Sequence, residues 1–273
     1  MTPERRWALP VAGAIVALGS ACAVSTQQEV QMGAGYASQI SQQLPLVKDP
    51  EVVRYINVLG DSLARVADDR NLTWHFEVVD SRDVNAFAVP GGYVYINRGL
   101  IERAQTMSQV ATVMGHEIGH VVKRHSIKQM QKAQGANVGV SLACILTRVC
   151  NNGLGQSALN LGGGALFAKF SRNDEAEADA EGVKTMIRAG IDPRGIPEMF
   201  RILLDERKDR PAGVDAWFTT HPMEEDRIAA TNAMIAQYPA ARLTGLTQDS
   251  PRFQEFKRHL MSLPPSPPAK RRG

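Results

Sequence analysis

A helical pattern of apolar residues marks the middle of this 273-residue chain. Apolar side chains recur there at spacings of three and four residues, at Met107, Val110, Met114, Ile118 and Val121. This spacing predicts an amphipathic helix with one buried face. The same stretch carries the sequence HEIGH at residues 116–120, so polar, chemically active side chains share a helix with a buried apolar face.

Similar patterns predict the elements around this helix. Further helices are expected over residues 27–44, 49–66, 194–208 and 223–238, and one more short helix after Pro251. Residues 85–92 predict a strand that runs into a Pro-Gly-Gly turn, and residues 93–97 a second strand. The expected fold class is therefore α+β, mainly helices around one site with a small β-sheet.

His116 and His120 place two imidazoles on one face of the predicted helix. Four residues turn through about 400°, so the two side chains lie about 40° apart, one turn above the other. At that spacing two neutral imidazole nitrogens can bind one metal ion, and Glu117 can reach a water at the open position of the metal. Glu117 could then act as a general base. A helix with two polar histidines and no metal is the alternative, although burying such a pair without a partner is costly.

A catalytic zinc ion usually has three protein ligands, so a third donor must come from another part of the chain. His125 is expected to point about 140° away from the other two and to interact with the dipole at the end of the same helix. The acidic residues 171–180 are better candidates, because they read as a helix start with an Asn or Asp cap. Glu175 and Asp179 would share a face, so that one could bind the metal and the other orient a histidine. A solvated acidic first turn accounts equally well for these residues.

Three motifs of this chain together resemble the M48 family of zinc metallopeptidases. They are NAFAVPGG at 85–92, HEIGH at 116–120 and SRNDEAEAD at 171–179. Within the family, the chain is similar to bacterial periplasmic members, often lipoproteins, that are related to the mitochondrial Oma1 protease. The resemblance spans residues from about 47 to about 238. It implies a mainly helical, zincin-like metallopeptidase fold with the small sheet beside the HExxH helix.

The resemblance implies one zinc ion per chain and assigns its ligands. His116, His120 and Glu175 match the metal ligands of the family, and Glu117 matches its general base. The substrates it implies are polypeptides.

The resemblance also assigns residues beside the metal. It implies that Asp179 is the carboxylate that orients a ligating histidine, whereas Glu177 lies outside the ligand position. Thr220-His221-Pro222 followed by Arg227 resembles a segment of the periplasmic members in which the histidine reaches the active site. There it either blocks the open coordination position or stabilises the oxyanion. From the residues alone, His221 is a loop histidine and Arg227 could be a surface salt-bridge former.

The first predicted strand is a candidate substrate-binding element. An edge strand near the site could bind an extended peptide by strand addition. Its residues would be Asn85, Ala86, Phe87 and Ala88. An ordinary hairpin is compatible with the same sequence.

Composition and charge restrict the partners. The chain is 44% apolar, enough for a substantial core, and its length allows one to two domains. The net charge of +3 is mild and gives no indication of nucleic acid. Residues 1–23 read as a secretory signal peptide. Cys22 approximates the cysteine of a lipobox, where acylation would attach the protein to a membrane. Ordinary cleavage at the small residues around Cys22 is the alternative.

Two further cysteines, Cys144 and Cys150, are six residues apart. In an exported protein this pair favours a disulfide, because two thiolate metal ligands would need two more donors and none lies nearby. The surrounding residues 135–164 could form either a buried helical segment or a lid over the site.

The sequence thus predicts four parts and one leading function. The parts are a signal peptide at 1–23, a tether and helix at 24–46, a metallopeptidase domain at 47–240, and a C-terminal helix with a proline-rich basic tail at 241–273. The resemblance implies a zinc endopeptidase of the bacterial periplasm, anchored to the outer membrane, that cleaves misfolded or unassembled envelope proteins. A chaperone-like binding protein whose zinc site is closed by His221 is the alternative. A di-iron carboxylate site is rejected, because no second Glu-x-x-His occurs.

Overall fold

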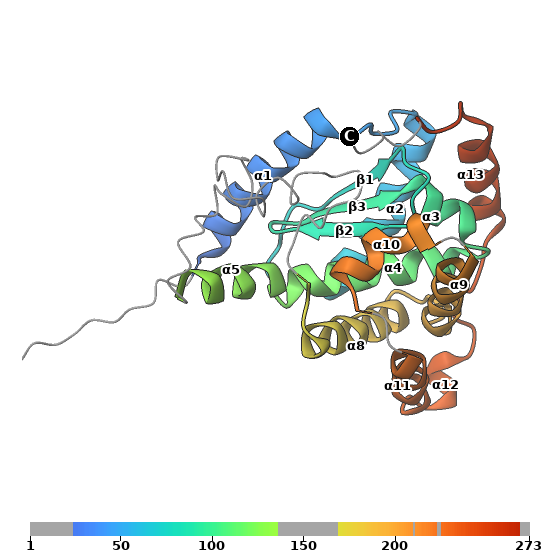
Figure 1. Ribbon diagram of the computed structural model, residues 1–273. Coiled ribbons are helices and arrows are strands. Elements are labelled where there is room, and N and C mark those ends of the chain that lie inside the picture. The colour runs from blue at the N-terminus through green and yellow to red at the C-terminus, as the bar shows by residue number, and fades with distance from the viewer. Residues whose placement is uncertain (1–23, 136–168, 210, 223–224, 268–273) are drawn as a thin grey trace, which may run out of the picture.

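The computed structural model of the protein describes residues 24–135, 169–209, 211–222 and 225–267 (Figure 1). Its helices and strands are α1 (Thr26–Gln43), α2 (Pro50–Ala67), β1 (His75–Val79), β2 (Ala86–Val89), β3 (Tyr93–Asn97), α3 (Arg98–Arg103), α4 (Met107–Val122), α5 (His125–Gly135), α8 (Arg172–Arg188), α9 (Gly195–Asp209), α10 (Pro211–Thr220), α11 (Glu225–Ala236), α12 (Ala240–Leu243) and α13 (Pro251–Ser262). The predicted α+β class, mainly helical with a small sheet, is confirmed. The predicted acylation at Cys22, the disulfide between Cys144 and Cys150, and nearly all of residues 135–164 lie outside the described residues.

The sheet has the strand order β1-β3-β2. β2 pairs antiparallel with β3, with Ala86 opposite Ile96 and Ala88 opposite Val94. β1 pairs parallel with β3 and is not among the strands predicted from the sequence. The predicted Pro-Gly-Gly turn is confirmed. Within the described part of the chain, β2 is therefore an edge strand of the sheet.

Helix α4, which carries the HEIGH sequence, lies at the centre of the molecule. Figure 1 shows it between the sheet and α8, and it packs against α2, β2, α8 and α9. All its residues from Ser108 to Val121 are buried. The prediction of a single buried face is therefore wrong. Helix α8 lies against the face that bears the histidines, α9 contacts the start of α4, and α2 and β2 pack on other parts of its surface.

Small residues let α4 and α8 approach closely. A Cβ added at Gly119 would lie 2.9 Å from the carbonyl oxygen of Ala178, which is too close for any side chain there. One turn earlier, a Cβ at Gly115 would lie 3.7 Å from the Cα of Gly182. The two helices therefore meet backbone to backbone, and this contact brings the acidic side chains of α8 against the histidines of α4.

The start of α8 is fixed by a capping box. The Ser171 hydroxyl accepts a hydrogen bond from the Asp174 backbone N–H, and the Asp174 carboxylate accepts one from the Ser171 N–H. The cap is therefore Ser171 and not the Asn or Asp that the sequence suggests. With this start, Glu175 and Asp179 lie on the buried face of α8, so the solvated acidic turn is wrong for these two residues.

Helix α1 is held against the end of α4 by one buried carboxylate. Glu29 is fully buried, and its Oε2 lies 2.9 Å from Arg70 Nη1 and 2.8 Å from Arg124 Nε. Arg70 also donates a hydrogen bond to the carbonyl oxygen of Val121, near the C-terminus of α4. Across the described ranges, no helix combines the length and the apolar character needed to cross a bilayer.

We predict that Gly119→Ala destabilises the protein, because the new methyl group must push α8 away from α4. Overpacking of this kind lowers the free energy of unfolding by about 1–3 kcal/mol. Gly35→Ala is the matched control, since Gly35 is an exposed helical glycine of α1 with open space around its Cα. It should gain about 0.5–1 kcal/mol. Urea unfolding of both variants measures the difference. A Gly119→Ala variant as stable as the control would show that the helices are not in tight contact.

Candidate active site

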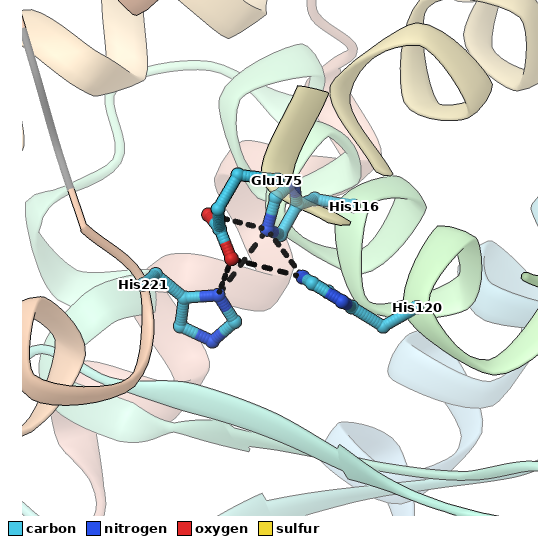
Figure 2. A group of neighbouring side chains, drawn as sticks. All are labelled: His116, His120, Glu175 and His221. Atoms are coloured by element: carbon cyan, nitrogen blue, oxygen red, sulfur yellow. Dashed lines mark hydrogen bonds and ion pairs between the residues drawn. The ribbon is translucent and has the colours of Figure 1, made fainter. Parts of the chain in front are cut away.

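Four side chains from three parts of the chain converge on one point (Figure 2). His116 and His120 come from α4, Glu175 from the first turn of α8, and His221 from the end of α10. The Nε2 atoms of His116 and His120 are 3.0 Å apart. Glu175 Oε2 lies 3.5 Å from His116 Nε2, and Glu175 Oε1 lies 3.4 Å from His120 Nε2. Each of the four residues is at most 3% exposed.

These distances fit the donor spacing of a metal site. Donors bonded at 2.0–2.1 Å to one tetrahedral zinc ion are separated by about 3.3 Å. The Nδ1 of His221 continues the same spacing, at 3.1 Å from Glu175 Oε1 and 3.3 Å from His116 Nε2. Imidazole nitrogens and a carboxylate are also the ligands that zinc commonly takes. The residues present therefore fit a single divalent cation.

The pKa values of the two α4 histidines shift in opposite directions. Burial lowers the pKa of His120 well below its usual value, and its hydrogen bond to the Glu175 carboxylate offsets only part of that effect. For His116, burial also lowers the pKa, but hydrogen bonds to the carboxylates of Asp179 and Glu175 outweigh it and raise the pKa to about 9. The negative charge of α8 is thus directed mainly at His116.

Glu117 lies beside this cluster and is 1% exposed. Its Oε1 is 3.4 Å from His221 Nε2 and has no hydrogen-bond partner within the described part of the protein. Burial raises the pKa of Glu117, against the opposing effect of nearby histidines and of a hydrogen bond from the Ala88 backbone. A buried carboxylate with a free lone pair and a raised pKa is suited to accept a proton.

Asp179 and Arg227 hold the other side of the cluster. Asp179 Oδ1 is 2.9 Å from His116 Nδ1, so it accepts the N–H of the nitrogen that faces away from the other donors. Arg227 lies 2.7 Å from both carboxylates, through Nη2 to Asp179 Oδ1 and through Nη1 to Glu175 Oε2. Burial raises the pKa of Asp179, but the Arg227 and His116 charges outweigh it and lower the pKa.

Arg227 is therefore not a surface salt-bridge former. Its guanidinium is largely buried, spans two carboxylates of α8, and lies 4.6 Å from the centre of the Phe200 ring. Spacing along α11 could not reveal this, because the partners of Arg227 are 48 or more residues away in the sequence.

His221 is likewise not a solvated loop histidine. It is 1% exposed and stacks on Trp217, one turn earlier in α10, with ring centroids 4.5 Å apart. The Phe170 ring stacks on His120, with ring centroids 4.0 Å apart. A hydrogen bond from Phe170 N to Thr220 O joins the two segments that carry these aromatic rings.

His125 is a polar residue of the site that sequence reasoning misplaced. It is fully buried, and its Nδ1 lies 2.9 Å from His120 Nδ1. The expected role at the dipole of the same helix is wrong, because α4 ends at Val122 and His125 begins α5. Arg124 has a φ of 58°, so the chain turns back after α4 and a rotation extrapolated along one helix does not apply.

The edge strand β2 passes next to Glu117. The four residues of the predicted substrate-binding strand are Asn85, Ala86, Phe87 and Ala88, and β2 packs against α4. A backbone hydrogen bond joins Ala88 to the Glu117 carboxylate. The Asn85 Oδ1 atom is buried and accepts no hydrogen bond from the described residues. The strand therefore contacts the Glu117 carboxylate through the backbone of Ala88.

Comparisons with known proteins agree with this geometry. A profile of peptidase family M48 matches residues 50–235. The beta-barrel assembly-enhancing protease of Escherichia coli strain K12 is 34% identical over 215 residues, covering 76% of this chain and 43% of that protein. The metalloprotease LoiP of the same strain is 34% identical over 154 residues, covering 56% of this chain and 59% of that protein.

A mitochondrial relative is also similar. The mitochondrial metalloendopeptidase OMA1 of Schizosaccharomyces pombe is 27% identical over 208 residues, covering 74% of this chain and 59% of that protein. The chain spans less than half the length of the beta-barrel assembly-enhancing proteases that it matches. Because the family profile covers about two thirds of the sequence and includes the whole histidine and carboxylate cluster, this chain belongs to peptidase family M48.

Proposed function

We propose that this protein is a zinc-dependent metalloendopeptidase of the bacterial cell envelope. One zinc ion would be held by His116, His120 and Glu175. The observation that carries the proposal is the convergence of these three buried donors, at the spacing of a tetrahedral site, beside the Glu117 carboxylate. Membership of family M48 and the protease names of the relatives support it.

Each residue of the cluster has a distinct part in this reaction. A bound zinc ion would polarise the scissile carbonyl and lower the pKa of the attacking water toward about 7. Glu117 takes a proton from that water and passes it to the leaving amine. Asp179 accepts the Nδ1–H of His116 and so keeps the Nε2 lone pair directed at the metal. Arg227 neutralises and aligns both carboxylates of α8.

The peptide substrate would bind along β2. An extended peptide can add to the free edge of a sheet through main-chain hydrogen bonds. Asn85 to Ala88 lie at the edge-strand position of the described sheet, and Ala88 lies against Glu117. A peptide added there would pass its backbone directly over the proposed general base.

The cellular role extends the same proposal. We infer that the substrates are misfolded or unassembled envelope proteins, and that residues 47–240 form the peptidase domain. Export by the predicted signal at 1–23, and attachment to the outer membrane through acylated Cys22, would bring enzyme and substrates together. The name of one relative, the beta-barrel assembly-enhancing protease, supports this location.

A latent form of the same site is the second candidate. His221 Nδ1 stands at donor distance from Glu175 and His116, where a catalytic site needs an open position. A zinc ion with four protein ligands would have no position for water. A chaperone-like binding protein with a closed site is therefore the alternative, and His221 decides between the two.

We predict that Glu117→Gln lowers peptide cleavage by at least about 10²-fold, because the amide cannot accept the proton of water. Zinc content should stay near that of the wild type, since Glu117 is not a proposed ligand. Glu181→Gln is the control, because Glu181 is a buried acid of α8 that pairs with lysines outside the site. Casein cleavage with zinc present, together with metal analysis, measures both effects. Unchanged cleavage by Glu117→Gln would refute the general-base assignment.

We predict that His221→Ala increases casein cleavage, because it frees the fourth donor position. If His221 instead stabilises the oxyanion, the same variant should lose about 10²–10³-fold in kcat. Trp217, which stacks on His221, provides a control for loosened packing through Trp217→Phe. Failure of both the wild type and His221→Ala to cleave casein in the presence of zinc would defeat the protease proposal.

We predict that Asp179→Ala weakens zinc binding about 10–100-fold, because His116 loses the acceptor that orients it. Glu175→Ala removes a proposed ligand and should weaken binding further. Competition for zinc with a chelating dye measures both dissociation constants. If Asp179→Ala binds zinc as tightly as the wild type, the carboxylate has no part in orienting the metal ligand.

A further inference from the structure

The two histidines of α4 have different partners on the nitrogens that face away from the cluster. His116 donates its Nδ1–H to the carboxylate of Asp179. His120 has no carboxylate within reach of its Nδ1, among the residues that the structure describes. Its partner is the Nδ1 of His125, at 2.9 Å, and both residues are at most 2% exposed. This contact lies outside the parts assigned above to the catalytic machinery.

The groups around His120 determine which of its two ring nitrogens carries the proton. His120 Nε2 faces His116 and Glu175, so its lone pair must point into the cluster for a cation to bind there. The proton of neutral His120 is then on Nδ1, and His125 Nδ1 must accept it. The proton of neutral His125 is therefore on Nε2, which lies 3.3 Å from Glu177 Oε2.

Acidic residues of α8 complete this series of hydrogen bonds. Glu177 Oε2 accepts from His125 Nε2, and Asp174 Oδ1 lies 3.8 Å from the same nitrogen. Glu177 was outside the ligand position of the family pattern, and the structure gives it a different contact, one histidine further from the cluster. Glu175 and Glu177 lie on different faces of α8. Glu175 contacts His120 directly, whereas Glu177 contacts His125, which in turn contacts His120.

The turn before His125 is stabilised by residues that are distant in the sequence. Arg124 adopts a left-handed backbone conformation, which is unfavourable for a non-glycine residue. Its guanidinium pairs with the buried Glu29 of α1, and Arg70 joins Glu29 to the carbonyl of Val121. Ion pairs therefore fix Arg124, the residue just before His125, in its strained conformation. This holds His125 in a defined position.

We propose that His125 is a positioning residue of the metal site, which accepts the Nδ1–H of His120 and thereby fixes the tautomer and orientation of that ligand. Phe170 already restrains the His120 ring by stacking, but stacking does not decide which nitrogen carries the proton. The hydrogen bond to His125 does. This inference rests on the proposed zinc site and adds a residue to it.

Two nearly isosteric substitutions test the hydrogen bond itself. His125→Asn keeps an acceptor oxygen at the δ position, whereas His125→Leu fills similar space without an acceptor. The zinc dissociation constant is measured with zinc alone, by competition with a chelating dye at fixed pH. His125→Leu should bind zinc about 10–100-fold more weakly than the wild type. His125→Asn should recover most of that loss.

Ile127→Ala controls for a loosened start of α5. Ile127 is 3% exposed, two residues from His125, and has no polar group to offer His120. Thermal unfolding of the metal-free proteins reports the stability lost in each variant. Ile127→Ala should lose stability without a matching loss of zinc affinity.

The outcomes separate this inference from the function on which it rests. Equal weakening by the Leu and Asn variants, or by Ile127→Ala, would mean that packing and not the hydrogen bond matters, and would overturn the inference. Wild-type zinc affinity in His125→Leu would overturn it as well, while leaving the proposed peptidase intact. A wild-type protein that binds no zinc would overturn both.

Discussion

The close contact between α4 and α8 is the constraint on which the site depends. Gly119 touches the backbone of Ala178, and no larger residue fits between the helices at this point. The contact brings Glu175 and Asp179 within hydrogen-bonding distance of two buried imidazoles. Burying a carboxylate costs several kcal/mol unless it gains partners, so these acids are tolerated because histidines and Arg227 surround them.

The acidic residues at the start of α8 have several different roles. The helical repeat places them on different faces of α8, so each contacts a different partner. Asp174 closes the capping box that starts the helix. Glu175 and Asp179, one turn apart, face α4 and contact the cluster directly. Glu177 lies on another face, about half exposed, and reaches His125 and Lys128 instead of the cluster. One short segment thus supplies a helix cap, a proposed metal ligand and acceptors for two different histidines.

The sequence predicted the local features of this protein and missed those that depend on distant contacts. Residues 85–97 carry clear turn and strand signals, and the HEIGH spacing places two histidines on one face of a helix whatever surrounds them. The buried roles of Arg227 and His221 depend on partners far along the chain, which periodicity does not reveal. His125 was misplaced for a local reason, because the left-handed Arg124 ends the helix where extrapolation continues it.

The most direct test of the account is to locate the metal. A crystal structure of the purified mature protein, with anomalous scattering measured at the zinc edge, shows where zinc binds and how many ions each chain holds. The account predicts one zinc per chain, about 2.0–2.1 Å from the Nε2 atoms of His116 and His120, with a carboxylate oxygen of Glu175 as the third protein ligand. Zinc bound elsewhere, or with Glu175 turned away from it, would contradict the account.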